Sequence, residues 1–242
     1  MSDHDAVRIS VAGDVSDPAL REDVRSRAAG LGLLGWVQLM EDGTLCVHAE
    51  GDRTAIDELI STLRSAGSLS ERTVRVEGHE QFAIRGVPAG VFVVQEHQAT
   101  AHHFDVRLEV DGVMRSWAVP KGPSMDPTVK RFAVEVEDHS IEHNEFEGPA
   151  GKGGVIIWDR GVYEQGGRVP WPEALERGHA VFVLHGEKLR GGFALQRTRG
   201  GEKAQWLMIK RRDEHAAPGS DIAAERPESV HSGVTLAELL DR

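Results

Sequence analysis

The sequence has 242 residues, 40 % of them hydrophobic, with 28 Lys and Arg, 39 Asp and Glu, and a formal net charge of −11. This length and composition predict a globular protein of one or two domains. A single cysteine, Cys46, excludes an internal disulfide, and the absence of a long apolar run or a basic-then-apolar leader predicts a cytosolic protein without a membrane partner.

The charge is distributed unevenly along the chain. Residues 1–77 carry 8 basic and 14 acidic side chains, residues 78–212 carry 18 of each, and residues 213–242 carry 2 and 7. A neutral middle segment lacks the broad basic surface of an avid duplex binder. Locally clustered Arg and Lys could still bind a short stretch of phosphate backbone.

Residues 1–78 are expected to form a first domain with the element order β-α-β-β-α-β. Strands are predicted at residues 7–13, 35–40, 44–51 and 71–78, and helices at residues 18–32 and 52–67. Asp52 is a suitable N-cap for the second helix, and Gly67 is expected to end it. Two such halves make the split βαβ, or ferredoxin-like, α+β fold.

The stretch VAGDVSDPALREDVRSRAAGLGLLGWVQLMEDGTLCVHAEG within residues 7–76 resembles the acylphosphatases. In that family a Gly-rich loop before a helix binds phosphate through backbone N–H groups, an Arg assists, and an Asn after a Gly-Trp-Val strand positions water. Arg21 and the Gly-Trp-Val at residues 35–37 match this pattern.

Other positions of the phosphate loop depart from the family. Asp14, Asp17 and Pro18 stand where an anion-binding loop needs glycine or uncharged residues, and Leu39 stands at the Asn position. We therefore predict a structural or binding module. A working acyl-phosphate hydrolase is the alternative.

Residues 79–212 are expected to form a second domain of many short strands, which predicts a barrel or a sandwich. In residues 103–110, apolar side chains alternate with His103, Asp105 and Arg107, as in a half-buried strand. Asp111 and Gly112 then predict a tight hairpin turn. Polar side chains two residues apart project about 7 Å from one another, so these three could converge on one small ion or phosphate.

Ordered blocks across residues 91–210 resemble the 3′-phosphoesterase domain of bacterial and archaeal DNA ligase D and its stand-alone relatives. The blocks are VFVVQEHQATAHHFDVRLEVDGVMRSWAVPKGPSMDP, KRFAVEVEDHSIEHNEFEG, GGVIIWDRGVYE, HGEKLRGGFAL and WLMIKRRD. The resemblance implies a small closed all-β barrel that holds one divalent transition metal, usually Mn²⁺. It also implies trimming of 3′-phosphate or 3′-ribonucleotide ends before ligation in non-homologous end joining, in a bacterial or archaeal cytosol.

The resemblance also implies roles for ten residues. By position, the metal ligands are His97, His103 and Asp105, the catalytic residues are His139, Arg107 and Arg131, and the substrate-binding residues are Gln95, Lys121, Glu137 and His143. Two imidazoles and one carboxylate leave room for water and a phosphate oxygen on the metal. The two guanidiniums would donate to non-bridging oxygens. His139 would bind phosphate or give a proton to the leaving oxygen.

Part of the family pattern is replaced. Glu80, Gln81 and Val87 stand at the Arg, Asp and Glu of the family's leading block, and His143 stands at a Tyr.

Three functions stay open. One is a metal-dependent phosphoesterase acting on primer-template DNA or DNA–RNA 3′ ends, with end-joining ligase or polymerase proteins as partners. The second is a non-catalytic nucleic-acid or repair-complex module, and the third is a small-molecule phosphohydrolase.

Residues 213–242 are polar and without periodicity, which predicts a mobile tail. Thr235 and Glu238 fit a capping box that opens a short terminal helix.

Overall fold

The computed structural model describes residues 5–151 and 153–241 and divides the chain into two units, with the boundary between Val87 and Pro88 and residues 168–170 grouped with the first unit. The boundary expected after residue 78 is therefore too early. Residues 82–85 form a strand that pairs in parallel with residues 35–38, and Phe82 is buried in the first core.

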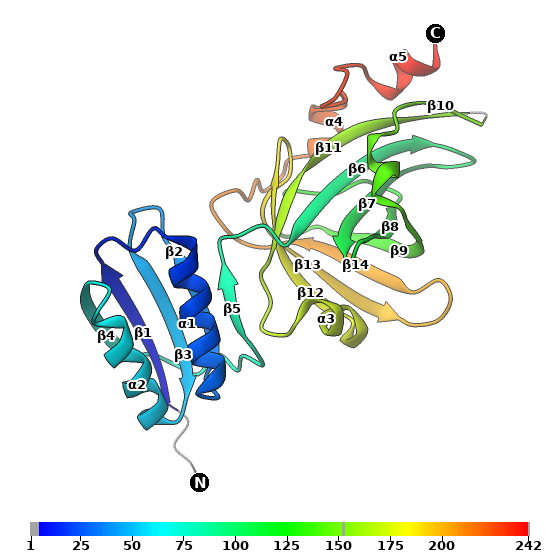
Figure 1. The fold of residues 1–242 in the computed structure, drawn as a ribbon. Coiled ribbons are helices and arrows are strands. Elements are labelled where there is room, and N and C mark those ends of the chain that lie inside the picture. Colours follow the sequence, from blue (N-terminus) through cyan, green and yellow to red (C-terminus); the bar gives the residue numbers. More distant parts are fainter. Residues whose placement is uncertain (1–4, 152, 242) are drawn as a thin grey trace. The chain divides into compact units, whose positions relative to one another are not determined.

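The first unit is a five-stranded sheet with the order β4-β1-β3-β2-β5. Helices α1 and α2 pack against this sheet through one apolar core (Figure 1). The ferredoxin-like prediction is confirmed, with β5 as an added edge strand. The elements are β1 (Asp5–Ala12), α1 (Pro18–Gly30), β2 (Leu34–Leu39), β3 (Leu45–Gly51), α2 (Arg53–Leu63), β4 (Ser68–Thr73) and β5 (Phe82–Arg85).

The helices of this unit begin at capped residues and present one buried face. The Asp52 carboxylate accepts a hydrogen bond from the Thr54 N–H at 2.8 Å, as the N-cap prediction requires. Along α2 the buried side chains are Ile56, Leu59, Ile60 and Leu63, the spacing of a helical face. The strand expected at residues 71–78 lies earlier, because β4 already pairs with β1 from residue 68.

The second unit is a closed antiparallel barrel. Among the described residues, eight strands form the ring, because β11 pairs with both β12 and β6, while β10 pairs only with β11 (Figure 1). The barrel prediction is confirmed. Its elements are β6 (Gly90–Gln98), β7 (His102–Val110), β8 (Val113–Val119), β9 (Lys130–His139), η1 (Ile141–Glu145), β10 (Gly148–Ala150), β11 (Gly153–Gln165), α3 (Trp171–Arg177), β12 (His179–Gly186), β13 (Arg190–Arg199), β14 (Gln205–Lys210), α4 (Ile222–Glu225) and α5 (Leu236–Leu240).

A two-residue turn joins β7 to β8. Asp111 and Gly112 have φ angles of 51° and 80°, the left-handed values that a tight hairpin of this kind needs. The turn sets Val110 opposite Val113, and the register continues to Arg107 opposite Ser116. The predicted hairpin is confirmed, and it decides which side chains share the polar face of the barrel.

The C-terminal segment is not the mobile tail that its composition predicts. The Trp158 ring N–H donates to the Arg226 carbonyl at 2.8 Å, and the Lys188 ammonium donates to the same carbonyl at 2.8 Å. Ser229 is 2 % exposed and donates to Glu147. The prediction was wrong because the polar side chains of the segment find partners on distant strands, which composition does not reveal.

The terminal helix begins as expected. The Thr235 side chain accepts from the Glu238 N–H, and the Glu238 side chain accepts from the Thr235 N–H, so the capping box is complete. In the part of the chain that the structure describes, every helix is too short or too polar to span a lipid bilayer.

The contact of Lys188 with this segment is expected to be pH-dependent. Burial over the Trp158 ring lowers the pKa of Lys188 to about 8, whereas an unfolded lysine titrates near 10.4. The unfolded state thus binds more protons between these values, and the free energy of unfolding should rise with pH there, by ~3 kcal/mol at most.

Denaturant unfolding of wild type and Lys188→Met at about pH 7.5 and pH 10 measures this effect. The difference between the two proteins should move in favour of the wild type at the higher pH. The same pH dependence in both proteins would contradict the prediction.

Candidate metal centre and active site

Two neighbouring strands bring three metal-ligand side chains together on one face of the barrel. His97 on β6 lies opposite His103 on β7, and Asp105 follows two residues after His103. The Asp105 carboxylate lies 3.8 Å from Nδ1 of His97 and 3.5 Å from Nε2 of His103. One ligand atom from each residue lies within 4.8 Å of the other two. We call His97, His103 and Asp105 the barrel cluster.

The charges of the barrel cluster suit a cation. Burial alone would raise the pKa of Asp105, but His103 and Arg107 beside it outweigh burial and lower it, so the group is a carboxylate. Burial, together with His103, lowers the pKa of His97 and favours its neutral form. Nδ1 of His103 donates to the Ala101 carbonyl at 3.0 Å, and the hydrogen bond with Asp105 raises the pKa of His103. A metal ion would have to displace the proton on Nε2 to use that atom as its ligand.

Arg107 is the hub of the polar network beside the barrel cluster. Arg107 is 3 % exposed and donates from Nε to Gln95 at 3.0 Å and from Nη2 to Asp105 at 3.1 Å. Its Nη1 donates to the Ser116 hydroxyl at 2.8 Å and to Nδ1 of His139 at 2.9 Å. Four of the five guanidinium N–H groups are thus engaged by the protein. The resemblance implied that Arg107 donates two hydrogen bonds to a phosphate. It could do so only by releasing one of these acceptors.

Gln95 is a buried residue that links Arg107 to the backbone of η1 and of Phe146. It is 1 % exposed, and its amide nitrogen donates to the carbonyls of His143 and Phe146 at 3.2 and 3.1 Å. The amide oxygen accepts from Arg107. Gln95 therefore holds Arg107 and η1 in place, whereas the resemblance implied contact with substrate.

Ser116 is a member of this network that sequence reasoning missed. Its hydroxyl accepts from Arg107 and donates to the Met114 carbonyl at 2.9 Å. A two-residue turn at Asp111 and Gly112 places Ser116 opposite Arg107, so the signal was present in the sequence.

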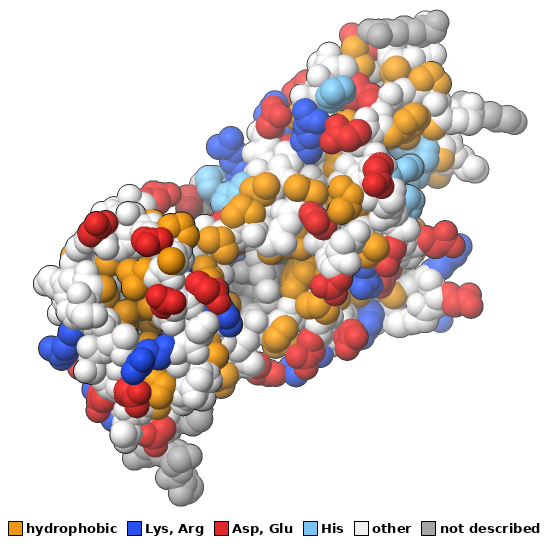
Figure 2. Space-filling view, viewed as in Figure 1, with side chains coloured by type: hydrophobic (Ala, Val, Ile, Leu, Met, Phe, Trp, Pro, Cys, Tyr) orange, Lys and Arg blue, Asp and Glu red, His pale blue; other side chains and the backbone are white. Residues whose placement is uncertain are grey.

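Two further imidazoles lie at the edge of the network. His139 ends β9, and its ring centroid lies 4.9 Å from that of His143 in η1. The His143 ring also stacks on Phe146, with centroids 6.4 Å apart. Burial, followed by the positive charge of Arg107, lowers the pKa of His143. Histidine side chains are visible on the surface of this unit in Figure 2 (pale blue).

The structure does not bring Arg131 to this network. Its guanidinium lies 3.8 Å from the Asp221 carboxylate. On β9, Val136 lies opposite Ser116, and Arg131 is an odd number of residues away from Val136 within an unbroken register. Alternate strand residues point to opposite faces, so Arg131 lies on the face away from the Arg107 network.

Lys121 and Glu137 are exposed positions near the strand ends. Lys121 follows β8 in a turn, and Glu137 lies on β9 next to the irregularity in its pairing with β8. Both side chains face solvent, where a substrate could reach them.

In the first unit, the loop that resembles a phosphate cradle is occupied by its own side chain. The Asp17 carboxylate caps α1 by accepting from the Ala19 N–H at 2.9 Å, and Pro18 has no N–H to offer. An anion at this helix end would meet a carboxylate. Leu39, at the end of β2, has no group that could position water.

We therefore expect no acyl-phosphatase activity from this unit. The full chain should hydrolyse an acyl phosphate such as benzoyl phosphate no faster than its Arg21→Ala variant. Release of phosphate, followed under pseudo-first-order conditions, measures both. A rate well above that of buffer that Arg21→Ala abolishes would show that the loop binds phosphate after all.

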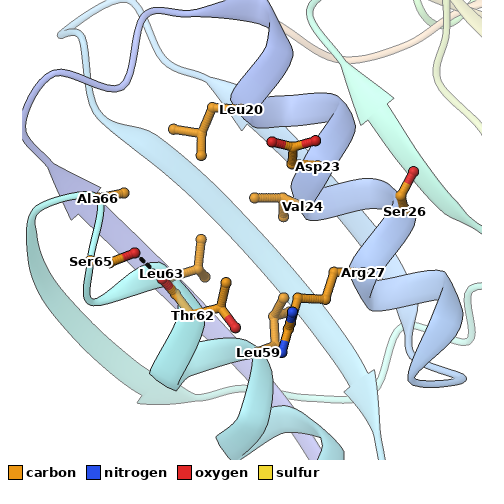
Figure 3. A pocket seen from close by; sticks show the side chains of 10 residues that line it. All are labelled: Leu20, Asp23, Val24, Ser26, Arg27, Leu59, Thr62, Leu63, Ser65 and Ala66. Carbon is orange, nitrogen blue, oxygen red and sulfur yellow. Dashed lines mark hydrogen bonds between the residues drawn. The ribbon is translucent and has the colours of Figure 1, made fainter.

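A cavity of about 600 Å³ lies between α1 and α2 (Figure 3). Its lining is formed by leucines, small polar side chains and Arg27, whose guanidinium lies 3.2 Å from Glu58. The Ser65 hydroxyl donates to the Thr62 carbonyl at 2.7 Å. Asp23 is the one carboxylate in this lining, and the metal-ligand groups among the described residues lie elsewhere, so the barrel cluster is the better candidate for chemistry.

Comparison with known proteins gives one family match in each unit. Residues 95–197 match the DNA Ligase D 3′-phosphoesterase domain, and residues 7–83 match the acylphosphatases. An acylphosphatase of Thermotoga petrophila is 31 % identical over 86 residues, which cover 33 % of this chain and 96 % of that protein.

Two longer relatives match more of the chain. The multifunctional non-homologous end joining protein LigD of Pseudomonas aeruginosa is 47 % identical over 154 residues, which cover 60 % of this chain. The multifunctional non-homologous end joining DNA repair protein LigD of Mycobacterium tuberculosis is 34 % identical over 205 residues, which cover 80 %. The matched regions span 18 % and 24 % of these two proteins.

Proposed function

Because the chain belongs to the acylphosphatase family in its first unit and carries a DNA ligase D 3′-phosphoesterase domain in its second, we propose that it trims DNA 3′ ends during end joining. The substrates would be primer-template ends that carry a 3′-phosphate or a 3′-ribonucleotide. The observation that carries this proposal is the barrel cluster with the Arg107–His139 pair beside it.

The barrel cluster fits one divalent transition metal, and we propose Mn²⁺. His97, His103 and Asp105 would hold it, and the Ala101 carbonyl fixes the tautomer of one ligand, as in established metal sites. When bound, the metal would act as a Lewis acid on a phosphate oxygen and make bound water more acidic.

The Arg107–His139 contact supports a definite role for His139. A guanidinium only donates hydrogen bonds, so Nδ1 of His139 must accept, and the neutral ring carries its hydrogen on Nε2. Nε2–H can donate to a non-bridging phosphate oxygen, where negative charge grows during attack on phosphorus. If the His139 ring were protonated, its Nδ1–H would point at the Arg107 guanidinium, which has no acceptor for it. Charge stabilisation is thus favoured over proton donation to the leaving oxygen.

In this account Arg107 is a positioning residue. Gln95, Ser116 and Asp105 hold its plane, and the guanidinium in turn orients the His139 ring. His143, next to His139 and exposed, is the residue that we propose to meet the substrate at the position where the family has a Tyr.

The test is single-turnover processing of labelled primer-templates that end in a 3′-phosphate or one 3′-ribonucleotide. The full chain should convert both in Mn²⁺ and neither after chelation. A protein that binds these DNAs in Mn²⁺ but leaves them unchanged would rule out the enzyme and favour the non-catalytic binding module.

Arg107→Lys is expected to lower the single-turnover rate by ~10²-fold. An ammonium on a flexible stem cannot hold four acceptors in one plane, and a displaced His139 loses contact with the reacting phosphate. Arg115→Lys is the matched control. Arg115 lies on the adjacent strand β8, pairs with Glu135 at 2.6 Å and takes no part in the hydrogen bonds around Arg107. Equal rates in the two variants would contradict the positioning role.

A further inference from the structure

A second group of metal-ligand side chains lies in the first unit. His48 is on β3, and Glu77 and His79 lie in the segment that follows β4. One ligand atom from each lies within 4.8 Å of the other two, and His48 and His79 are 0 % and 3 % exposed. Buried imidazoles beside a carboxylate are an unusual arrangement on a small domain, and neither family assignment accounts for it. We call these three residues the His48 cluster.

Glu50 contacts all three members, His48 through its ring and Glu77 and His79 through their backbone N–H groups. Its carboxylate is 1 % exposed and lies 2.8 Å from Nε2 of His48. The same carboxylate accepts from the backbone N–H groups of Glu77, Gly78 and His79, the last two at 3.1 and 3.0 Å. A carboxylate that fixes one histidine and the backbone of two other ligands is the support that metal-binding imidazoles need. It leaves Nδ1 of His48 as the ring nitrogen that faces a cation.

A cation already lies at this position. Nη2 of Arg8 is 3.2 Å from the Glu77 carboxylate and 3.4 Å from Nδ1 of His48. The guanidinium carbon of Arg8 also lies 4.7 Å from the centre of the Trp36 ring. The Arg8 side chain is 24 % exposed, so its end can turn toward solvent and vacate the space between the two ligands.

We infer that the His48 cluster binds a divalent transition ion of the zinc type and that the Arg8 guanidinium takes its place when the ion is absent. Two imidazoles and one carboxylate are a common zinc ligand set, with water in the fourth position. Ligand atoms about 2.1 Å from zinc at tetrahedral angles lie about 3.4 Å apart. The cluster needs only a small contraction to reach this spacing.

The site joins two parts of the first unit that are distant in sequence. His48 belongs to the central strand β3, whereas Glu77 and His79 belong to the connection between β4 and β5. A bound ion would fasten this connection to the sheet and stabilise the first unit. The inference does not depend on the proposed function, because none of its residues belongs to the barrel cluster.

Zinc binding by the full chain tests the inference. After chelation and desalting, wild type should bind two equivalents of Zn²⁺, and the His103→Ala, Asp105→Ala double variant should retain one. In that double-variant background, Glu77→Gln should weaken binding by at least ~10-fold, because it replaces an anionic ligand on a partly exposed side chain.

Arg8→Met in the same background should tighten zinc binding by ~10-fold if Arg8 fills the site most of the time. If Arg8 served only a structural ion pair, Arg8→Met would remove that pair without raising the affinity for zinc. The inference is overturned if the double variant binds no zinc, if Glu77→Gln leaves the affinity unchanged, or if Arg8→Met fails to raise it.

Discussion

Replacing His139 with alanine is expected to lower the single-turnover rate on a 3′-phosphate primer-template by ~10²–10³-fold, with the metal still bound. The substitution removes one hydrogen-bond donor aimed at the phosphate and no member of the barrel cluster. Metal content measured after desalting should equal that of wild type. A loss of metal together with activity would instead place His139 among the ligands.

His139→Gln distinguishes the two roles that an imidazole could have. The Gln amide nitrogen can occupy roughly the place of Nε2 and donate a hydrogen bond, but it cannot release a proton at neutral pH. If His139 stabilises charge through Nε2–H, the Gln variant should retain clearly more activity than the Ala variant. Equal inactivity of the two would favour proton donation to the leaving oxygen.

The double variant His103→Ala, Asp105→Ala is expected to lose the Mn²⁺ of the barrel cluster and to lower turnover by ~10³-fold or more. One imidazole is too small a ligand set to hold a divalent ion, and the Lewis acid contributes several kcal/mol of charge stabilisation. Mn²⁺ binding, followed by electron paramagnetic resonance, and turnover are measured on the same sample.

His102→Ala is the control for this double variant. His102 lies next to His103 on β7 but pairs with Glu96 at 2.7 Å and is outside the barrel cluster. It should keep both Mn²⁺ and activity. Full Mn²⁺ occupancy in the double variant would show that the ion is held elsewhere, and the proposed metal centre would be wrong.

Asp105 in the barrel cluster and Glu50 beside the His48 cluster differ in what they support. Asp105 faces two partly exposed imidazoles and Arg107 at the polar face of the barrel. Glu50 is closed in by His48 and three backbone N–H groups. The first arrangement suits a metal that must exchange ligands during a reaction. The second suits an ion that holds two segments together.

Short-range patterns in the sequence determined most of the secondary structure and the shared face of two members of the barrel cluster, whereas His97 was added by the family resemblance. Strand alternation put His103, Asp105 and Arg107 on one face, and the Asp111–Gly112 turn set the register of β7 with β8. Asp52 and the Thr235–Glu238 pair marked helix starts correctly. These features depend on residues close together in the chain, whose geometry is set by local backbone and side-chain chemistry.

Long-range pairing decided the rest. The parallel pairing of β5 with β2 moved the boundary between the units, and the partners of Lys188 and Trp158 ordered a segment that looked mobile. The engagement of Arg107 by four acceptors and the position of Arg131 on the opposite face also depend on tertiary contacts. The His48 cluster joins residues about 30 positions apart. No local pattern encodes such a contact, because it forms only when the packing of the whole domain brings its strands and loops together.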